Sequence, residues 1–168
     1  VRDEETVELG IRAALTGHLV FSTIHTNDAA SGFTRLLNWD VEPFLIASTV
    51  KGILAQRLVR RICNECKESY SPNENELEMI GLGKDDPIGA YKGKGCLACR
   101  NTGFKGRIGI YELLLMDGEI SELVLNQEPG YKIREQARAN GMTTLLEDGL
   151  IKIKRGDTTI SEVYETLG

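Results

Sequence analysis

Four cysteines occur in two Cys-x-x-Cys pairs, and thiolates at this spacing can hold a metal ion. The first pair is Cys63 and Cys66 and the second is Cys96 and Cys99, with residues 67–95 between the pairs. Two turns can direct all four thiolates at one tetrahedral zinc ion. The alternatives are two disulfides or a thioredoxin-like redox pair. A redox pair needs only one Cys-x-x-Cys near a βαβ unit, so we favour structural zinc.

A site closed by four protein thiolates leaves no coordination position for water or substrate, which predicts a scaffolding role. The separation between the pairs exceeds the commonest zinc-ribbon gap, so the intervening segment must loop out. Glycines are expected where the backbone turns tightly around a metal. The second pair is flanked by four of them, namely Gly93, Gly95, Gly103 and Gly106.

The two histidines, His18 and His25, bracket a short and mostly apolar run at residues 19–24. The run lacks clean alternation, which is typical of a strand buried on both faces of a parallel sheet. Ligands of open α/β sheets lie at the carboxyl ends of strands, where His25 falls, and a helix start there favours an anion. For His18, a hydrogen bond to a carbonyl at a helix exit is an equally good interpretation.

The sequence lacks the other common catalytic motifs. The phosphate-binding pattern G-x-x-x-x-G-K-[ST] is absent, and residues 89–95 have the wrong spacing and end in glycine where a hydroxyl should hold magnesium. No Ser-His-Asp elbow, HExxH helix or dinucleotide fingerprint occurs either. The residues by themselves therefore predict a zinc-stabilised α/β protein with one candidate anion site.

The pattern of apolar residues predicts the elements that must position these groups. Asp3 can cap a helix that stops at Gly17, and residues 26–28 offer three successive caps for a second helix. A third helix begins at Pro43 and carries Leu54 on its apolar face. The first sixty residues therefore predict helix, strand, helix, helix, which is half of an α/β unit.

The pattern of apolar residues weakens over residues 69–87, where we expect a short helix and loops that close over the zinc. A strand is predicted over residues 107–115. The remaining segment predicts four helices, over residues 119–126, 131–140, 145–155 and 159–167.

Length and composition limit the class of protein. The 168 residues can form one domain or two small ones. No run approaches about 18 apolar residues, so no membrane-spanning segment is predicted. The net charge of −5 argues against a general nucleic-acid coat. The chain starts at Val1 inside a charged segment, and we expect it to be a piece of something longer.

Four segments together resemble the traffic ATPases of type II secretion and type IV pilus assembly. Residues 2–6 resemble the segment after the Walker B glutamate, and residues 16–29 resemble the histidine box of that family. Residues 56–63 and 109–114 resemble the arginine-rich lead into its tetracysteine module and the strand that leaves it. The likeness covers essentially the whole chain, in order, and is to the carboxy-terminal portion of the family.

The family branch is indicated by two further segments. Residues 27–30 and 41–48 resemble the type II secretion branch more than the type IV pilus branch, which stays the alternative.

The resemblance implies an α/β fold, namely the second half of a RecA-like P-loop ATPase core. It also implies an inserted four-cysteine zinc module and a helical carboxy-terminal subdomain. The implied domains are residues 1–62 for the core with the histidine box, 63–106 for the zinc module, and 107–168 for the returning strand and helices.

The resemblance further implies roles for single residues. His25 would lie near the γ-phosphate of ATP, and Asp3 and Glu5 would shape the catalytic site beside magnesium. The ATP-binding side would include His18, Thr23 and Arg57. The Walker B glutamate would precede Val1. The resemblance also implies that Arg57, Arg60 and Arg61 meet phosphates or a neighbouring subunit, although a solvated or acid-paired cluster explains Arg60 and Arg61 at least as well.

The parent protein would be a hexamer on the cytoplasmic face of the inner membrane. Its ATP turnover would act on inner-membrane platform proteins and drive pseudopilus assembly and protein export across the outer membrane. Because the phosphate loop and its lysine are missing, we expect the isolated chain to hydrolyse no ATP.

Two other function classes remain open, a zinc-ribbon nucleic-acid module and a protein-docking domain. The first is favoured by basic residues near the second cysteine pair, namely Lys92, Lys94, Arg100, Lys105 and Arg107. The acidic total charge and the lack of stacking aromatics beyond Tyr91 and Phe104 argue against it, so we expect no nucleic-acid partner.

Overall fold

The computed structural model describes residues 3–83 and 88–168, which form two compact units. The first unit contains Val1–Ala55 and Glu112–Thr143, and the second contains Gln56–Tyr111 and Thr144–Gly168. These boundaries differ from those of the three modules that the family resemblance implies, and the modules stay a prediction.

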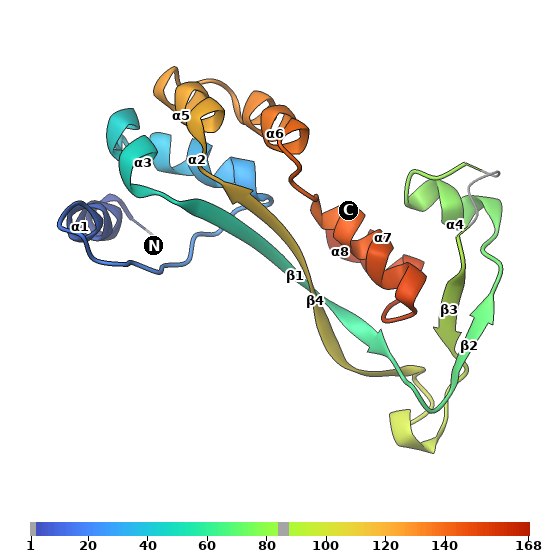
Figure 1. Ribbon diagram of the computed structural model, residues 1–168. Coiled ribbons are helices and arrows are strands. Elements are labelled where there is room, and N and C mark those ends of the chain that lie inside the picture. The colour runs from blue at the N-terminus through green and yellow to red at the C-terminus, as the bar shows by residue number, and fades with distance from the viewer. Residues whose placement is uncertain (1–2, 84–87) are drawn as a thin grey trace. The chain divides into compact units, whose positions relative to one another are not determined.

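The first unit is mainly helical (Figure 1). Its helices are α1 (Glu4–Leu15), α2 (Ala29–Leu37), α3 (Pro43–Thr49), α5 (Gly118–Leu125) and α6 (Gly130–Ala139). Helix α3 packs on α5, and α6 packs on both α2 and α5. The core of this unit consists of side chains with no exposed surface, namely Phe33, Ile46, Ile120, Val124 and Ile133.

Aspartates define the start of several helices in the first unit. The side chain of Asp3 accepts a hydrogen bond from the Thr6 backbone N–H at 2.9 Å, and Asp117 accepts one from Ile120 at 2.8 Å. Each carboxylate pairs one of the backbone N–H groups that have no partner within the helix. The capped start at Asp3 is the one that the sequence predicts.

Two long strands, β1 (Gly52–Ile62) and β4 (Phe104–Leu115), pair with each other. The Met116 N–H donates to the Lys51 carbonyl at one end, and the Cys63 N–H donates to the Gly103 carbonyl at the other, so the strands run antiparallel. The predicted strand over residues 107–115 is therefore confirmed as part of β4.

The second unit contains the cysteine-bearing segment and the last two helices. Its elements are β2 (Lys67–Tyr70), α4 (Glu74–Met79), β3 (Ala90–Gly93), the 3-10 helix η1 (Leu97–Cys99), α7 (Leu145–Arg155) and α8 (Ile160–Leu167). Strands β2 and β3 form an antiparallel pair, with Lys67 opposite Gly93 and Tyr70 opposite Ala90. Helix α7 packs on both α8 and β3.

Helix α7 illustrates how local sequence sets its own limits. Thr144 and Glu147 form a reciprocal capping box at its start, and Gly156 ends it with a left-handed backbone at φ 71°. Basic residues in the last turn face the negative end of the helix dipole. The helices predicted over residues 119–126, 131–140, 145–155 and 159–167 are all confirmed.

The strand predicted over residues 19–24 is wrong. These residues follow an extended path without strand pairing, and their side chains are largely exposed, with Leu19 at 80% and Phe21 at 88%. A parallel strand buried on both faces needs a paired strand on each side. The described part of the chain supplies neither neighbour.

The third predicted helix is confirmed at its start but not along its length. Helix α3 begins at Pro43 and ends at Thr49, and Leu54 lies in β1. The apolar residues over this stretch fit a helical repeat and a strand equally well, and pairing with β4 decides for the strand. The short helix expected between residues 69 and 87 is confirmed as α4, whereas residues 84–87 of that segment lie outside the described residues.

Among the helices of the described residues, none is both long and apolar enough to cross a bilayer.

Candidate functional site

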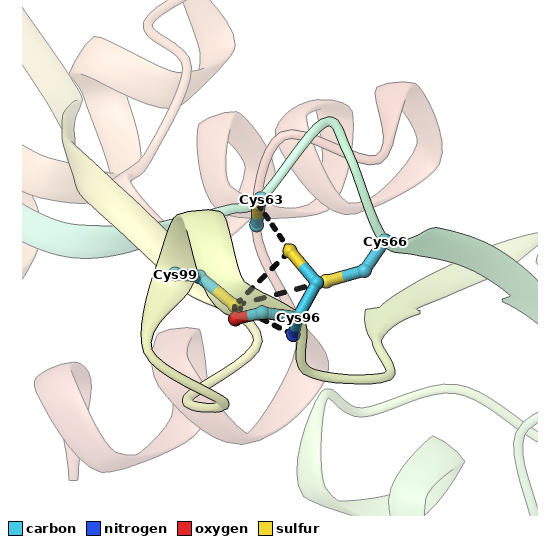
Figure 2. A group of neighbouring side chains, drawn as sticks. All are labelled: Cys63, Cys66, Cys96 and Cys99. Carbon is cyan, nitrogen blue, oxygen red and sulfur yellow. Dashed lines mark hydrogen bonds between the residues drawn. The ribbon is translucent and has the colours of Figure 1, made fainter.

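The four cysteine side chains converge on one point (Figure 2). Cys63 directly follows β1 and Cys66 directly precedes β2, while Cys96 precedes η1, whose last residue is Cys99. All four Sγ atoms lie within 4.8 Å of one another. Two segments that are far apart in the sequence therefore meet at one thiol cluster, as the cysteine spacing predicts.

The sulfur separations match a tetrahedral thiolate site. The Sγ atoms of Cys63 and Cys96 lie 3.9 Å apart, as do those of Cys66 and Cys99, and those of Cys96 and Cys99 lie 3.7 Å apart. Zinc–sulfur bonds of about 2.3 Å in tetrahedral geometry place neighbouring sulfurs about 3.8 Å apart. Because disulfide sulfurs lie about 2.05 Å apart and all four thiols are free, the structure disagrees with two disulfides.

A close backbone approach closes the loop that carries the second cysteine pair. A Cβ atom added to Gly93 would lie 2.1 Å from the carbonyl oxygen of Gly103. A larger residue at position 93 would therefore push β3 away from the turn at Gly103. Gly95 has a φ of 92°, and the turn after Cys99 places Arg100 at a φ of 54°. The glycines expected from the sequence around the second pair therefore allow the tight turns that a metal site needs.

Backbone N–H groups also face the sulfur atoms. The N–H groups of Cys96 and Gly103 donate to the Sγ of Cys99 at 3.2 and 3.3 Å. Burial opposes the charged form of Cys99, but these donors outweigh it and lower the pKa of the thiol to about 6. Loss of solvent raises the pKa of Cys66 to about 12. The cluster therefore combines one thiol that ionises readily with one that needs a cation to do so.

The donor set fits a closed structural metal site. Cys63 and Cys99 are buried and Cys66 and Cys96 are partly buried, so the ligands lie at the surface of the second unit without being open to it. Four thiolate sulfurs select a soft or borderline cation that accepts tetrahedral geometry. With four protein ligands, no coordination position remains for a substrate.

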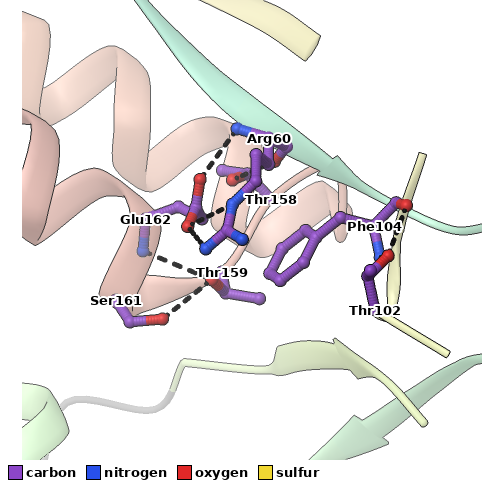
Figure 3. A network of polar contacts seen from close by, with 7 residues as sticks. All are labelled: Arg60, Thr102, Phe104, Thr158, Thr159, Ser161 and Glu162. Carbon is purple, nitrogen blue, oxygen red and sulfur yellow. Dashed lines mark hydrogen bonds and ion pairs between the residues drawn. The ribbon is translucent and has the colours of Figure 1, made fainter. Parts of the chain in front are cut away.

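Arg60 belongs to a separate polar network in the same unit (Figure 3). Its backbone N–H and its Nε donate to Glu162 at 2.9 Å each, and Nη2 also contacts that carboxylate. The Thr158 hydroxyl donates to the Arg60 carbonyl at 2.8 Å, and the Phe104 ring lies 4.3 Å from the guanidinium. The hydrogen bonds from Arg60 lower the pKa of Glu162, although burial opposes them. The acid-paired interpretation of Arg60 is therefore confirmed.

His25 lies in the loop before α2, four positions ahead of its first residue, and its side chain is exposed. It lines an open depression of the first unit together with Asn27, Asp28, Arg35 and Arg134. The helix start and the cap by Asp28, whose Oδ1 accepts from the Ser31 N–H at 2.7 Å, are as the sequence predicts. His18 is exposed, and its Nδ1 lies 3.0 Å from the Thr16 hydroxyl and 3.3 Å from the Ala13 carbonyl. The predicted helix-exit contact of His18 is thus present.

The other predicted ATP-side residues lie on separate elements. Asp3 and Glu5 are exposed at the start of α1, Thr23 is exposed in the extended segment, and Arg57 is half-buried on β1. Within residues 3–83 and 88–168, no hydrogen bond or ion pair joins Asp3 or Glu5 to His25. The functional roles of these residues stay predictions.

Sequence reasoning missed one buried carboxylate beside the histidine loop. Glu112 has no exposed surface, and its Oε1 accepts a hydrogen bond from the Ala29 N–H at 2.9 Å. An acidic residue in a strand whose alternate positions, Ile110 and Leu114, are apolar was the signal that could have revealed it.

Comparison with known proteins shows the family. A family model described as "Type II/IV secretion system protein" matches residues 1–165. The type IV pilus assembly ATPase PilB of Thermus thermophilus is 48% identical over 97% of this chain, which is 19% of that protein. The type II secretion system protein E of Pseudomonas aeruginosa is 42% identical over 97% of this chain, which is 32% of that protein. The chain thus spans about a fifth to a third of these relatives.

The fold also resembles a solved structure, that of the pilus retraction motor PilT with bound ADP. The TM-score is 0.64 at 24% identity, over 98% of this chain and 37% of that one. This likeness confirms the predicted fold class, part of a RecA-like α/β core with a four-cysteine module and carboxy-terminal helices. The chain belongs to the type II/IV secretion system protein family.

Proposed function

We propose that the chain is the carboxy-terminal part of a hexameric ATPase that drives pseudopilus assembly for type II secretion. The observation that carries the proposal is the unbroken match to the family over residues 1–165, with relatives of 42–48% identity that are named as secretion proteins and pilus ATPases. Because the chain covers only part of each relative, the phosphate loop would come from residues outside it. The ATPase activity is therefore proposed for the parent protein.

Exposed apolar side chains in the first unit support the proposal that residues outside this chain complete its ATPase core. Leu19 and Phe21 are exposed on the extended segment, and Leu54, Leu113 and Leu115 are exposed on the β1–β4 ribbon of the same unit. Large apolar side chains exposed on one strand pair are the kind of surface that another part of a protein covers.

His25 is the residue that we assign to the γ-phosphate. Its exposed side chain, four positions before the first residue of α2, supports this role, because an imidazole can donate a hydrogen bond to an anion. Asp3 and Glu5 would face the magnesium ion, and His18, Thr23 and Arg57 would lie on the ATP side, once the rest of the core is present.

Zinc is the ion that we propose for the cysteine cluster, in a structural role. Three of the sulfur separations are 3.7–3.9 Å and all lie within 4.8 Å, which suits the roughly 3.8 Å edge of a tetrahedral zinc–thiolate site. When bound, zinc would cross-link the end of β1 to the turn around η1, and the buried thiols would be held as thiolates.

The type II secretion branch rests on residues 27–30 and 41–48, since relatives of both branches match at similar identity. We place the parent protein on the cytoplasmic face of the inner membrane, bound to platform proteins, because the family resemblance implies that setting. Restoring secretion, but not piliation, in strains that lack the corresponding ATPase would support the type II branch, and the reverse result would favour the type IV pilus branch.

A nucleic-acid role for the tetracysteine module has less support than protein docking. Lys92 and Lys94 both pair with Glu68, at 3.7 and 2.9 Å, and Phe104 is already stacked against Arg60. Leu97, between the cysteines of the second pair, is 93% exposed. An exposed leucine beside paired basic residues suits a protein partner better than a phosphate backbone.

The proposed role of His25 is tested by substitution in the full-length protein. We expect His25→Ala to lower kcat for ATP hydrolysis by roughly 100-fold, since a misplaced or missing group near the γ-phosphate costs about that much. Glu122→Gln, an exposed change on α5 outside the proposed site, is the control and should leave kcat unchanged. Equal kcat for His25→Ala and the wild type would contradict the assignment.

A further inference from the structure

Glu112 is a buried carboxylate to which neither the sequence motifs nor the proposed function assigns a role. It has no exposed surface, and Ile110 and Leu114 beside it on β4 are equally buried. Burial of a carboxylate is strongly unfavourable unless the group is hydrogen-bonded and paired with a positive charge. The partners of Glu112 therefore indicate what it is for.

The first partner is the start of helix α2. The Ala29 N–H donates to Oε1 of Glu112 at 2.9 Å, across 83 positions in the sequence, and Ala29 is itself fully buried. The first N–H groups of a helix lack partners within the helix and carry its positive end. Glu112 thus satisfies one of them and fixes the start of α2 to strand β4.

The second partner is Arg134 on α6. Its Nη2 lies 4.0 Å from Glu112, and its Nη1 lies 3.5 Å from Asp28. Asp28 in turn caps α2 by accepting from the Ser31 N–H at 2.7 Å. Strand β4 and helix α6 therefore both hold the residues at which α2 begins.

The histidine loop is attached at this point. His25 lies three positions before Asp28, and the Thr26 hydroxyl donates to the Asp28 carbonyl at 3.0 Å. The side chains of His25, Asp28 and Arg134 line the same open depression. Movement at the start of α2 would consequently move the imidazole.

We propose that Glu112 is a positioning residue that holds the His25 loop through the Ala29 N–H and Arg134. The inference rests on the proposed function, in which His25 acts at the γ-phosphate, and it names a group that keeps the imidazole in place. Glu112 itself touches no reacting atom in this scheme.

The direct test observes the imidazoles by NMR. The chain contains only two histidines, so His18→Gln assigns the His25 signals and His18 serves as an internal control in all other variants. We expect Glu112→Ala to shift or broaden the His25 signals and to leave those of His18 in place. Glu112→Gln keeps an acceptor for the Ala29 N–H and should produce a smaller shift. Glu135→Gln, an exposed substitution next to Arg134, should change neither.

Unchanged His25 signals in folded Glu112→Ala protein, or equal shifts of both histidines, would overturn the proposal. If Glu112→Ala fails to fold by circular dichroism, Glu112→Gln and Arg134→Gln decide in its place. Each of these removes the attraction between Glu112 and Arg134 while retaining an acceptor for Ala29, and each must shift His25 selectively.

Kinetics of the full-length protein provide the second readout. Glu112→Ala should lower kcat by roughly tenfold to 100-fold, with KM for ATP within about twofold of the wild type. In a His25→Ala background it should add no further loss, because both changes act through the same group. The same fold-loss in both backgrounds would contradict positioning. If His25→Ala alone leaves kcat unchanged, the proposed function fails, and the NMR shifts still decide the role of Glu112.

Discussion

Four thiols held within 4.8 Å of one another cannot all ionise unless a cation lies among them. Backbone donors hold the pKa of Cys99 at about 6 against the effect of burial, so this sulfur is the ligand most readily available. Burial raises the pKa of the Cys66 thiol, and a bound metal ion would favour its thiolate form. Metal binding at this cluster should therefore release protons and stabilise the fold.

Removing one thiol should remove the metal. We expect the wild-type chain to contain about one zinc ion and Cys99→Ser to contain almost none, since a structural zinc site needs all four ligands. Asn64→Ala, at an exposed position between the first two cysteines, is the matched control. Metal content by mass spectrometry together with thermal unfolding measures the effect. Full zinc content in Cys99→Ser would disprove the four-thiolate site.

Glu162 should make the stability of the chain depend on acid pH. Its pKa is lowered by the hydrogen bonds from Arg60, so its contribution is complete above the unfolded pKa of about 4.3 and is lost as the pH falls through the lower folded pKa. Glu162→Gln should cost about 1–3 kcal/mol of unfolding free energy at neutral pH. It should also reduce the fall in unfolding free energy as the pH is lowered. Glu165→Gln, an exposed change on the same helix, is the control. Parallel pH profiles for Glu162→Gln and the wild type would contradict the assignment.

At the level of single residues, the sequence predicts functional groups whose partners lie nearby along the chain. Spacing alone identifies Cys63, Cys66, Cys96 and Cys99, because a Cys-x-x-Cys turn places its own two sulfurs together. Glu112 and Glu162 have partners 83 and 102 positions away. No local pattern indicates such pairs, and only the folded chain brings them together.

Among the elements, the crossing of β3 with the turn at Gly103 is the most constrained. A Cβ at Gly93 would lie 2.1 Å from the backbone oxygen of Gly103, and neither atom belongs to a flexible side chain. Gly93→Ala should therefore open the loop that carries Cys96 and Cys99, lower zinc affinity at least tenfold and reduce stability by more than about 1 kcal/mol. A competition titration with a chelator measures the affinity.

Gly89→Ala is the matched control for this prediction. Gly89 is exposed, and a Cβ there would meet no atom within 4 Å. Equal zinc affinity in Gly93→Ala and Gly89→Ala would show that the crossing does not support the metal site.

Helices were predictable in this chain and most strands were not, for one physical reason. The limits of α7 are set by Thr144, Glu147 and Gly156, all within or beside the helix. Strand β1 forms by pairing with β4, which follows it by more than forty positions. Without that partner in view, the apolar pattern at the start of β1 predicts a longer third helix. Residues 19–24 show the converse, since a strand-like pattern forms no strand without partners on both sides.

At the scale of the whole molecule, charge predicts how the chain treats nucleic acid. The net charge is −5, and two of the basic residues near the second cysteine pair share ion pairs with Glu68. We expect binding to single- and double-stranded DNA to be weak, without the steep salt dependence that phosphate contacts produce. Fluorescence anisotropy over a salt series measures this. Tight binding that falls steeply with salt would favour the zinc-ribbon alternative.

We propose that this chain holds the histidine box and the zinc module of an ATPase whose phosphate loop lies elsewhere in the parent protein. The most direct test of this proposal is steady-state ATP hydrolysis by the full-length protein and by the isolated chain, at equal chain concentration and with magnesium. We expect turnover by the full-length protein and none above background by the isolated chain. Equal turnover by both, or none by the full-length protein, would contradict the proposal.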